Sequence, residues 1–240
     1  MTMNIALIGY GKMGKAIEQV AVNKGHKIVA IFNTANCNEL EAGKLNNADV
    51  AIEFTNPEAA PKNIEDCINA GVAVVCGTTG WNVHAQYIND LARARNVGLL
   101  CASNFSIGVN IFFEINKQLA ALMNGRSDYN VGVSETHHVH KKDKPGGTAI
   151  TIAEQIIANN NLKTNWVLDG TSAQNVVPIT ANRVGEVPGI HTVTYSSVID
   201  DIEITHTAHN RMGFASGAVL AAEFMFGKSG IYTMRDVLGL

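Results

Sequence analysis

Residues 4–14, NIALIGYGKMG, decide the fold of the N-terminal half of the chain. The apolar run at 4–8 predicts a buried strand, and residues 16–23 show the apolar periodicity of a helix. The G-x-G-x-x-G spacing between them matches the dinucleotide-binding turn, whose glycines permit a tight turn, close approach of a pyrophosphate and close packing of the helix. The pyrophosphate would lie at the N-terminus of the helix. The alternative is a glycine-rich turn without a ligand.

Strand and helix patterns continue to alternate up to residue 101. Strands are predicted at residues 27–32, 49–54, 72–76 and 97–101, and helices at 57–70 and 82–95. This βαβα order predicts a mostly parallel sheet covered by helices, with ligands at the carboxyl ends of the strands. Polar loops follow two of those ends, at residues 77–80 (GTTG) and 102–105 (ASNF). Several such loops at one edge of the sheet favour a ligand site there.

The end of the second predicted strand lacks the acid that dinucleotide-binding folds place there. Asn33 occupies the position of the carboxylate that hydrogen-bonds the adenosine ribose. An amide can bond a ribose hydroxyl and does not repel a 2′-phosphate, to which Lys12 could offer a positive charge. NADH and NADPH therefore both stay open as cofactors. An equal alternative is that Asn33 is only a turn residue.

The pattern changes after a predicted helix at residues 107–122. Strand patterns at 130–135, 175–183, 189–199 and 201–209 surround one clear helix at 148–160. The apolar segment 215–226 has to pack against other elements, and the first sheet is its natural partner. We therefore predict an α/β protein with a Rossmann-type dinucleotide-binding domain (residues 1–106 and 212–240) and a smaller α+β domain with a mixed sheet (residues 107–211).

The composition predicts a globular protein with a small partner. Charged residues make up 16% of the 240 residues, and the net charge of −3 gives no basic footprint for nucleic acid. No apolar run is long enough for a membrane span, and the N-terminus enters a strand pattern without a signal peptide, so we expect a cytoplasmic protein. The four cysteines have no CxxC spacing, which predicts neither a disulfide nor a zinc site.

The segment 135–148, ETHHVHKKDKPGGT, concentrates charge in a sparsely charged chain. It lies between a predicted strand and a predicted helix, and we interpret it as a strand-to-helix loop that holds reactive groups. Its three histidines could be a metal site. However, the adjacent His137 and His138 would point apart, and neither a cysteine nor a well-placed carboxylate completes a zinc set. We expect no metal. Lys142, Lys144 and His140 are best explained as solvated or packing residues.

Several of these motifs together resemble one known family. GYGKMG, GTTG, SNFSIGVN, ETHHVHKKDKPGGTA and EITHTAHNRMGFASGA are similar to segments of the dihydrodipicolinate reductases, also called 4-hydroxy-tetrahydrodipicolinate reductases, of lysine and diaminopimelate biosynthesis. The resemblance extends over nearly the whole chain. It implies reduction of a cyclic, unsaturated dicarboxylate to tetrahydrodipicolinate by hydride transfer from NADH or NADPH. It also implies a homotetramer assembled through the sheets of the second domain, which would bind the substrate.

The resemblance assigns roles within the charged segment. His137 matches the family's general acid, Lys141 its catalytic lysine and His138 a substrate-contacting position. Gly147 and Thr148 would donate hydrogen bonds to the carboxylates of the substrate at the start of the following helix. Gly146 departs from the family pattern, because many relatives carry serine there, and one hydroxyl donor is lost.

The resemblance also implies where the cofactor lies. The residues near it would be Gly9, Tyr10, Gly11, Lys12, Met13, Asn33, Gly77, Thr78, Thr79, Ala102, Ser103, Asn104 and Phe105. Two rival functions remain. One is another NAD(P)-dependent imine reductase, such as an aspartate-type dehydrogenase, and the other is a non-catalytic dinucleotide sensor. A sensor would have no need of His137, Lys141 and the GGT turn together.

Overall fold

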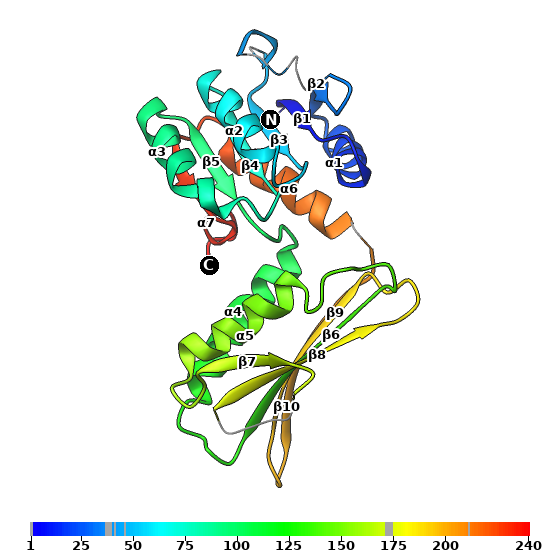
Figure 1. The fold of residues 1–240 in the computed structure, drawn as a ribbon. Helices are drawn as coiled ribbons and strands as arrows, with labels where there is room; N and C mark the ends of the chain where they lie inside the picture. The colour runs from blue at the N-terminus through cyan, green and yellow to red at the C-terminus, as the bar shows by residue number, and fades with distance from the viewer. Residues whose placement is uncertain (1, 37–39, 41, 46, 171–174, 211) are drawn as a thin grey trace. The chain divides into compact units, whose positions relative to one another are not determined.

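The first structural unit is built on a parallel sheet of six strands, as seen in the computed structural model (Figure 1). The strands are β1 (Asn4–Ile8), β2 (Lys27–Phe32), β3 (Val50–Glu53), β4 (Ala73–Cys76), β5 (Gly98–Cys101) and β11 (Gly230–Tyr232), in the order β11-β5-β4-β3-β1-β2. The direction of winding reverses between β1 and β3, and such a switch point opens a crevice at the carboxyl ends of the strands. The glycine loop after β1 lies at that point.

Helices cover both faces of this sheet. On one face α1 (Lys12–Asn23), α6 (Met212–Met225) and α7 (Met234–Leu238) contribute to one apolar core, and on the other α2 (Ala60–Asn69) and α3 (Ala85–Arg95) contribute to a second. Two short 3-10 turns, Ala42–Leu45 and Asn82–His84, complete the unit. The four inner strands β1, β3, β4 and β5 are almost fully buried, which explains their apolar sequences, whereas β2 at one edge is partly exposed.

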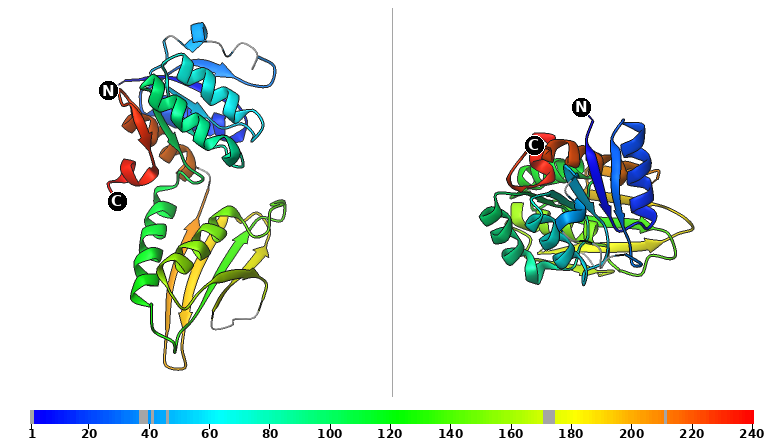
Figure 2. Two further views of the ribbon diagram at one scale, coloured as in Figure 1. Left: turned by 60° about the vertical axis from the view of Figure 1, so that its left-hand side comes forward. Right: turned by 90° about the horizontal axis from the view of Figure 1, so that it is seen from above.

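The second unit has a five-stranded mixed sheet. Its elements are α4 (Ile107–Leu122), β6 (Asn130–His137), α5 (Gly147–Asn159), β7 (Asn165–Leu168), β8 (Val176–Arg183), β9 (Gly189–Ser196) and β10 (Asp201–Ala208). The order is β10-β9-β6-β8-β7, with β8 parallel to both β6 and β7 and the other pairs antiparallel. Both helices pack on one face of the sheet, around a single apolar core (Figures 1 and 2).

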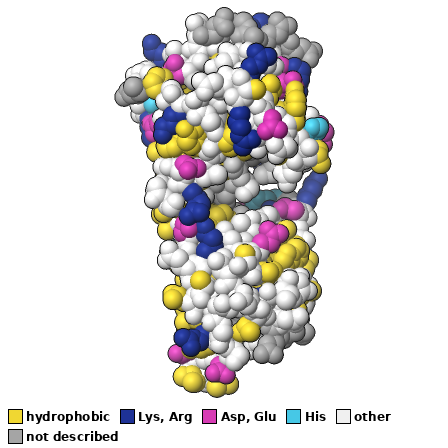
Figure 3. Space-filling model, turned by 90° about the vertical axis from the view of Figure 1, so that its left-hand side faces the viewer, with side chains coloured by type: hydrophobic (Ala, Val, Ile, Leu, Met, Phe, Trp, Pro, Cys, Tyr) yellow, Lys and Arg dark blue, Asp and Glu magenta, His cyan; other side chains and the backbone are white. Residues whose placement is uncertain are grey.

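The structure describes residues 2–36, 40, 42–45, 47–170, 175–210 and 212–240. The chain divides into the units Met1–Ile107 with Arg211–Leu240 and Gly108–Asn210. Cys67, Cys76 and Cys101 are free thiols, whereas Cys37 lies outside the described residues. None of the described helices combines the length and the apolar character that crossing a membrane requires. On the face drawn in Figure 3, acidic and basic side chains are interspersed.

The predicted fold class is confirmed, with corrections at the ends of elements. β6 continues two residues beyond the predicted end and includes His137, because Thr136 pairs with Ile190 and His137 pairs with Arg183 on the two neighbouring strands. The interpretation of the charged segment as a loop was therefore wrong for Thr136 and His137. Three short elements were not predicted, namely β7, β11 and α7.

Gly217 provides a test of how closely α6 packs. A Cβ atom at Gly217 would lie 1.8 Å from the carbonyl oxygen of Phe105, whereas one at Gly213 on the same helix would meet only Ser106 Oγ at 3.7 Å. We expect Gly217→Ala to lower the free energy of unfolding by about 3 kcal/mol through overpacking. Gly213→Ala, the matched control, should leave it unchanged or raise it by up to ~1 kcal/mol, since alanine favours helix. Urea unfolding of both variants measures the difference, and equal stabilities would contradict the packing argument.

Candidate active site

The three glycines of the first loop have three different surroundings. Gly9 has a φ of 93°, and a Cβ there would lie 2.0 Å from the carbonyl oxygen of Phe54. A Cβ on Gly14 would lie 2.2 Å from the carbonyl oxygen of Gly9, so the helix packs directly on the turn. A Cβ on Gly11 would meet no atom of the described residues within 4 Å. Backbone atoms thus leave no room for a side chain at Gly9 and Gly14, whereas Gly11 faces open space.

The N-terminus of α1 adjoins this space. Gly11 is the N-cap residue, no side chain caps the helix, and its first turn contains no acidic residue. The first N–H groups of a helix lack partners within the helix and attract anions. The loop is therefore suited to a pyrophosphate.

A pocket of about 540 Å³ lies beside the loop. Its described lining residues are Gly11, Lys12, Met13, Phe54, Thr55, Pro57, Gly77, Thr78 and Thr79. A hydrogen bond of 2.8 Å from the N–H of Thr55 to Thr78 Oγ1 joins the loops after β3 and β4. The pocket thus brings together six of the residues expected near a cofactor, from the loops that follow β1 and β4.

The other expected cofactor residues lie outside the described lining of this pocket. Gly9 forms the turn beneath it, and Tyr10 donates a hydrogen bond to Glu18. In the turn after β5, Ala102 is half-buried and Ser103 is exposed. Asn104 and Phe105 in the same turn are buried. Phe105 packs in the core beside Phe54, with ring centroids 5.6 Å apart.

Asn33 takes part in a local turn. Its Oδ1 accepts a hydrogen bond of 2.8 Å from the N–H of Ala35, and its own N–H donates to Asn36 Oδ1 at 2.7 Å. These bonds are those of a turn residue, which was one of the two alternatives. A contact with a ribose stays a prediction.

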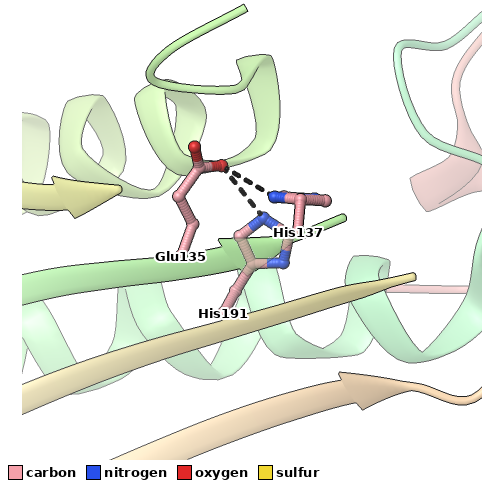
Figure 4. Close-up of side chains that lie close together, drawn as sticks. All are labelled: Glu135, His137 and His191. Atoms are coloured by element: carbon pink, nitrogen blue, oxygen red, sulfur yellow. Dashed lines mark ion pairs between the residues drawn. The ribbon is translucent and has the colours of Figure 1, made fainter. Parts of the chain in front are cut away.

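In the second unit, the side chains of Glu135, His137 and His191 converge (Figure 4). Oε2 of Glu135 lies 3.3 Å from Nδ1 of His137 and 3.9 Å from Nε2 of His191. The two rings are nearly perpendicular, with centroids 5.1 Å apart. The three facing atoms are buried, and within the described residues none of them makes an aligned hydrogen bond.

Glu135 is a fully buried carboxylate that stays ionised. Its Oε1 accepts hydrogen bonds of 3.0 Å from the N–H of Gly146 and from Arg183 Nη2. Burial alone raises the pKa of Glu135, but His137, the Gly146 N–H and Arg183 outweigh it and lower the pKa to about 2. The site therefore contains a fixed negative charge.

His191 is a neutral neighbour of this charge. Burial lowers its pKa from the usual 6.5 to about 4, and the charge of His137 acts in the same direction. His191 lies directly opposite Glu135 in the pairing of β6 with β9.

The remaining predicted site residues follow β6. Nζ of Lys141 forms an ion pair with Asp143 at 2.6 Å. Nδ1 of His138 is buried and has no hydrogen-bond partner among the described residues. Gly147 and Thr148 form the first turn of α5, where Gly146 is the N-cap residue and no side chain caps the helix. That terminus is suited to a carboxylate.

Glu135, His137 and His191 can also be considered as metal ligands. Each offers one ligand atom, and these atoms lie within 4.8 Å of one another. The expectation that no well-placed carboxylate accompanies the histidines was wrong, because β6 carries Glu135 and His137 on the same face. Arg183 already pairs with Glu135, and this positive charge disfavours a cation there. We assign no metal to the cluster.

Comparisons with known proteins agree on one family. Residues 3–105 match "Dihydrodipicolinate reductase, N-terminus" and residues 108–238 match "Dihydrodipicolinate reductase, C-terminus". The chain belongs to the dihydrodipicolinate reductase family. It is 49% identical to a 4-hydroxy-tetrahydrodipicolinate reductase of Christiangramia forsetii over 98% of both chains. It is 35% identical to one of Neisseria gonorrhoeae, over 93% of this chain and 84% of the other.

The fold is also shared with solved structures. A dipicolinate-bound dihydrodipicolinate reductase from Paenisporosarcina sp. TG-14 has a TM-score of 0.76 at 22% identity, covering 97% of this chain and 98% of that chain. An amine dehydrogenase from Mycobacterium smegmatis has a TM-score of 0.62 at 12% identity, covering 97% and 95%. At these identities the likeness concerns the fold alone.

The sequence analysis did not identify several residues at the two sites of this dihydrodipicolinate reductase family member. Phe54, Thr55 and Pro57 follow β3 at the same sheet edge as the glycine loop, and their position after a predicted strand was the signal that could have found them. Arg183 and His191 reach Glu135 from other strands. Their approach depends on strand pairing, for which the sequence contains no local signal.

The low pKa of His191 predicts a dependence of stability on pH. In the folded state His191 stays neutral down to about pH 4, whereas in the unfolded chain it takes up a proton near its usual pKa of 6.5. Its contribution to stability is therefore complete above pH 6.5 and is lost as the pH falls toward 4. Between pH 7 and 5 this contribution amounts to about 2 kcal/mol, at roughly 1.4 kcal/mol per pH unit.

Denaturant unfolding at pH 7 and pH 5 measures this contribution. We expect His191→Gln to show a smaller loss of unfolding free energy between the two pH values than the unsubstituted chain. His84→Gln, which replaces an exposed histidine, should show the same loss as the unsubstituted chain. An equal loss in all three proteins would refute a depressed pKa at His191.

Proposed function

We propose that this chain is a 4-hydroxy-tetrahydrodipicolinate reductase of lysine biosynthesis that uses NADH or NADPH. The observation that carries the proposal is the match to both halves of the family, together with 49% identity over 98% of a relative of that name. The two sites described above contain the groups that such a reaction requires. One suits a dinucleotide and the other suits an anionic substrate and a proton transfer.

The glycine loop would hold the pyrophosphate of the cofactor. Gly11 leaves room for it, and the N–H groups at the start of α1 would donate hydrogen bonds. Lys12 adds a positive charge at the pocket, and Thr78 and Thr79 line its other side. When bound, the nicotinamide supplies the hydride. Asn33 and the 102–105 turn are proposed to complete the cofactor contacts near the ribose and the nicotinamide.

The substrate is proposed to be a cyclic dicarboxylate bound by the second unit. The N–H groups of Gly147 and Thr148 begin α5 and would donate to one carboxylate, which the helix N-terminus also favours. His138, with its buried Nδ1, is proposed to contact the substrate as well.

His137 and Lys141 are proposed to perform the acid chemistry. Hydride addition to a conjugated carbon–nitrogen system leaves negative charge that a proton has to neutralise, and an imidazolium can supply one. His137 is mostly buried, with 12% of its side chain exposed, so its charge acts in a poorly hydrated site. Lys141 would stabilise the developing charge.

We further propose a cytoplasmic homotetramer. The resemblance to the family implies that the sheets of the second domain form the subunit contacts. In this chain α4 and α5 cover one face of the five-stranded sheet, so the subunit contacts would use the opposite face. Size-exclusion chromatography with light scattering tests the assembly.

The first test is turnover with both cofactors. We expect the chain to oxidise NADH or NADPH when freshly made 4-hydroxy-tetrahydrodipicolinate is added. The loss of absorbance of the reduced nicotinamide measures this oxidation. His137→Gln should lower kcat by about 10²–10⁴-fold, the usual contribution of a general acid, and leave cofactor affinity nearly unchanged. Turnover only with oxaloacetate and ammonia would instead favour an aspartate-type dehydrogenase, and wild-type turnover of His137→Gln would disprove the proton-donor role.

Cofactor choice is tested at the end of β2. Asn33 presents no negative charge, so a 2′-phosphate should be accepted there. We expect Asn33→Asp to lower kcat/KM for NADPH by about 10-fold or more through charge repulsion, while kcat/KM for NADH changes little. Asn36→Asp, in the same turn, is the control for a general effect of added charge. If both substitutions change the two cofactors equally, Asn33 does not lie near the ribose.

A further inference from the structure

Glu135 stands out as a buried charge that the proposed reaction does not yet use. It lies two residues before His137 on β6, so both side chains leave the same face of the sheet. His191 lies opposite Glu135 on β9. In Figure 4 the carboxylate is turned toward both rings, and Oε2 is 3.3 Å from His137 Nδ1. A buried carboxylate facing an imidazole nitrogen is an arrangement that can orient an acid or a base.

The carboxylate of Glu135 is fixed from its other side. Both hydrogen bonds to Oε1 come from groups that are themselves held: the N–H of Gly146 at the start of α5, and Arg183 on β8. Arg183 also donates to the backbone carbonyls of Lys141 and Asp143. A Cβ on Gly146 would lie 2.7 Å from Oε2, so the absence of a side chain leaves room for the carboxylate. Oε2 is therefore directed at the imidazoles.

This geometry determines which nitrogen of His137 can release a proton. A carboxylate oxygen only accepts hydrogen bonds when ionised, so the nitrogen facing it has to carry a hydrogen. We infer that Glu135 is a positioning residue that keeps a hydrogen on Nδ1 of His137, so that Nε2 is the atom that gives up the proton. The inference rests on the proposed role of His137 as the proton donor. Glu135 acts through the imidazole and need not touch the substrate.

The surroundings of Nε2 agree with this assignment. Gly189 lies beside it, and a Cβ at that position would be 3.1 Å from Nε2. A side chain at residue 189 would therefore crowd this nitrogen from the side of β9. Nδ1, in contrast, is buried against the carboxylate. Among the described residues Nδ1 is a buried atom without a hydrogen-bond partner, and Nε2 is not one of these atoms.

Charged and titratable groups from several elements surround His137. Groups from four parts of the unit act on the cluster: Glu135 from β6, Arg183 from β8, His191 from β9 and Lys141 from the following loop, with His206 of β10 beyond His191. Arg183 and Lys141 are cations and oppose a further positive charge. His191 is kept neutral by burial. Glu135 is therefore the anion that faces the imidazole.

The same three atoms would be the ligands of a metal ion if the cluster were a metal centre. If Glu135 positions His137, the cluster holds a hydrogen on Nδ1. If the cluster is a metal centre, it holds a divalent cation instead. Arg183 and Lys141 disfavour the cation, and one carboxylate oxygen is already engaged by Gly146 and Arg183. The experiments below separate the two.

The first experiment reads the tautomer of His137 in the unsubstituted protein. Heteronuclear NMR of the chain labelled with ¹⁵N-histidine, with assignment from the His137→Gln spectrum, shows which ring nitrogen carries hydrogen in the neutral imidazole. We expect hydrogen on Nδ1. Hydrogen on Nε2 would overturn the inference, whatever the activity of the protein, and no variant of Glu135 has to fold for this measurement.

The second experiment follows kcat and KM in Glu135→Gln. We expect kcat to fall about 10- to 100-fold with KM for the cofactor within about 2-fold, because a residue that orients a reacting group affects the chemical step. Glu186→Gln is the matched control, since Glu186 lies 3.5 Å from His140 but is exposed.

A double substitution shows whether Glu135 acts through His137. Adding Glu135→Gln to His137→Gln should cause no further loss of kcat, since the group that Glu135 positions is absent. A loss equal to that in the wild-type background would overturn the inference. So would loss of activity on treatment with a chelator and its recovery with Zn²⁺ alone, which would make the cluster a metal centre. If the tautomer is as expected but the unsubstituted chain does not reduce the precursor, the proposed function fails and the positioning by Glu135 stands.

Discussion

The second unit depends on the burial of one carboxylate. Removing Glu135 from water costs several kcal/mol unless its charge is compensated by hydrogen bonds and opposite charge. Arg183 from β8 and the N–H of Gly146 at the start of α5 provide that compensation, and His191 of β9 lies opposite. Three strands and the N-terminus of a helix thus meet at this side chain. The pKa of Glu135 is lowered to about 2 because His137, the Gly146 N–H and Arg183 together outweigh the effect of burial.

In the first unit the corresponding constraint is steric. Gly9 and Gly14 bring the backbone of the turn, the end of β3 and the start of α1 closer together than any side chain would allow. This close packing places the free N–H groups of α1 beside the pocket that follows β1, β3 and β4. One unit therefore prepares its site by leaving out side chains, and the other by burying a charge.

These two constraints explain how far the sequence could be interpreted. The glycine loop and the strands around it are local patterns, so the parallel sheet and six residues of its pocket could be predicted. His137, Lys141, Gly147 and Thr148 lie in one segment and could be recognised together as well. The partners of Glu135 could not, because Arg183 and His191 approach it only through the register of β8 and β9 with β6. Short elements such as β11 were missed because three residues contain too little periodicity.

The two residues by which β6 extends beyond its predicted end are important for the chemistry. If the strand ended at Glu135, the carboxylate and His137 would have no fixed relation, and a flexible loop could present either ring nitrogen. Because pairing continues to Thr136 on the β9 side and to His137 on the β8 side, Glu135 and His137 lie on one face and their separation is set by the pleat of the strand. His137, the proposed proton donor, then has a defined orientation before any ligand arrives. Preorganisation of this kind lowers the cost of reaching the transition state, since the imidazole need not be reoriented during the reaction.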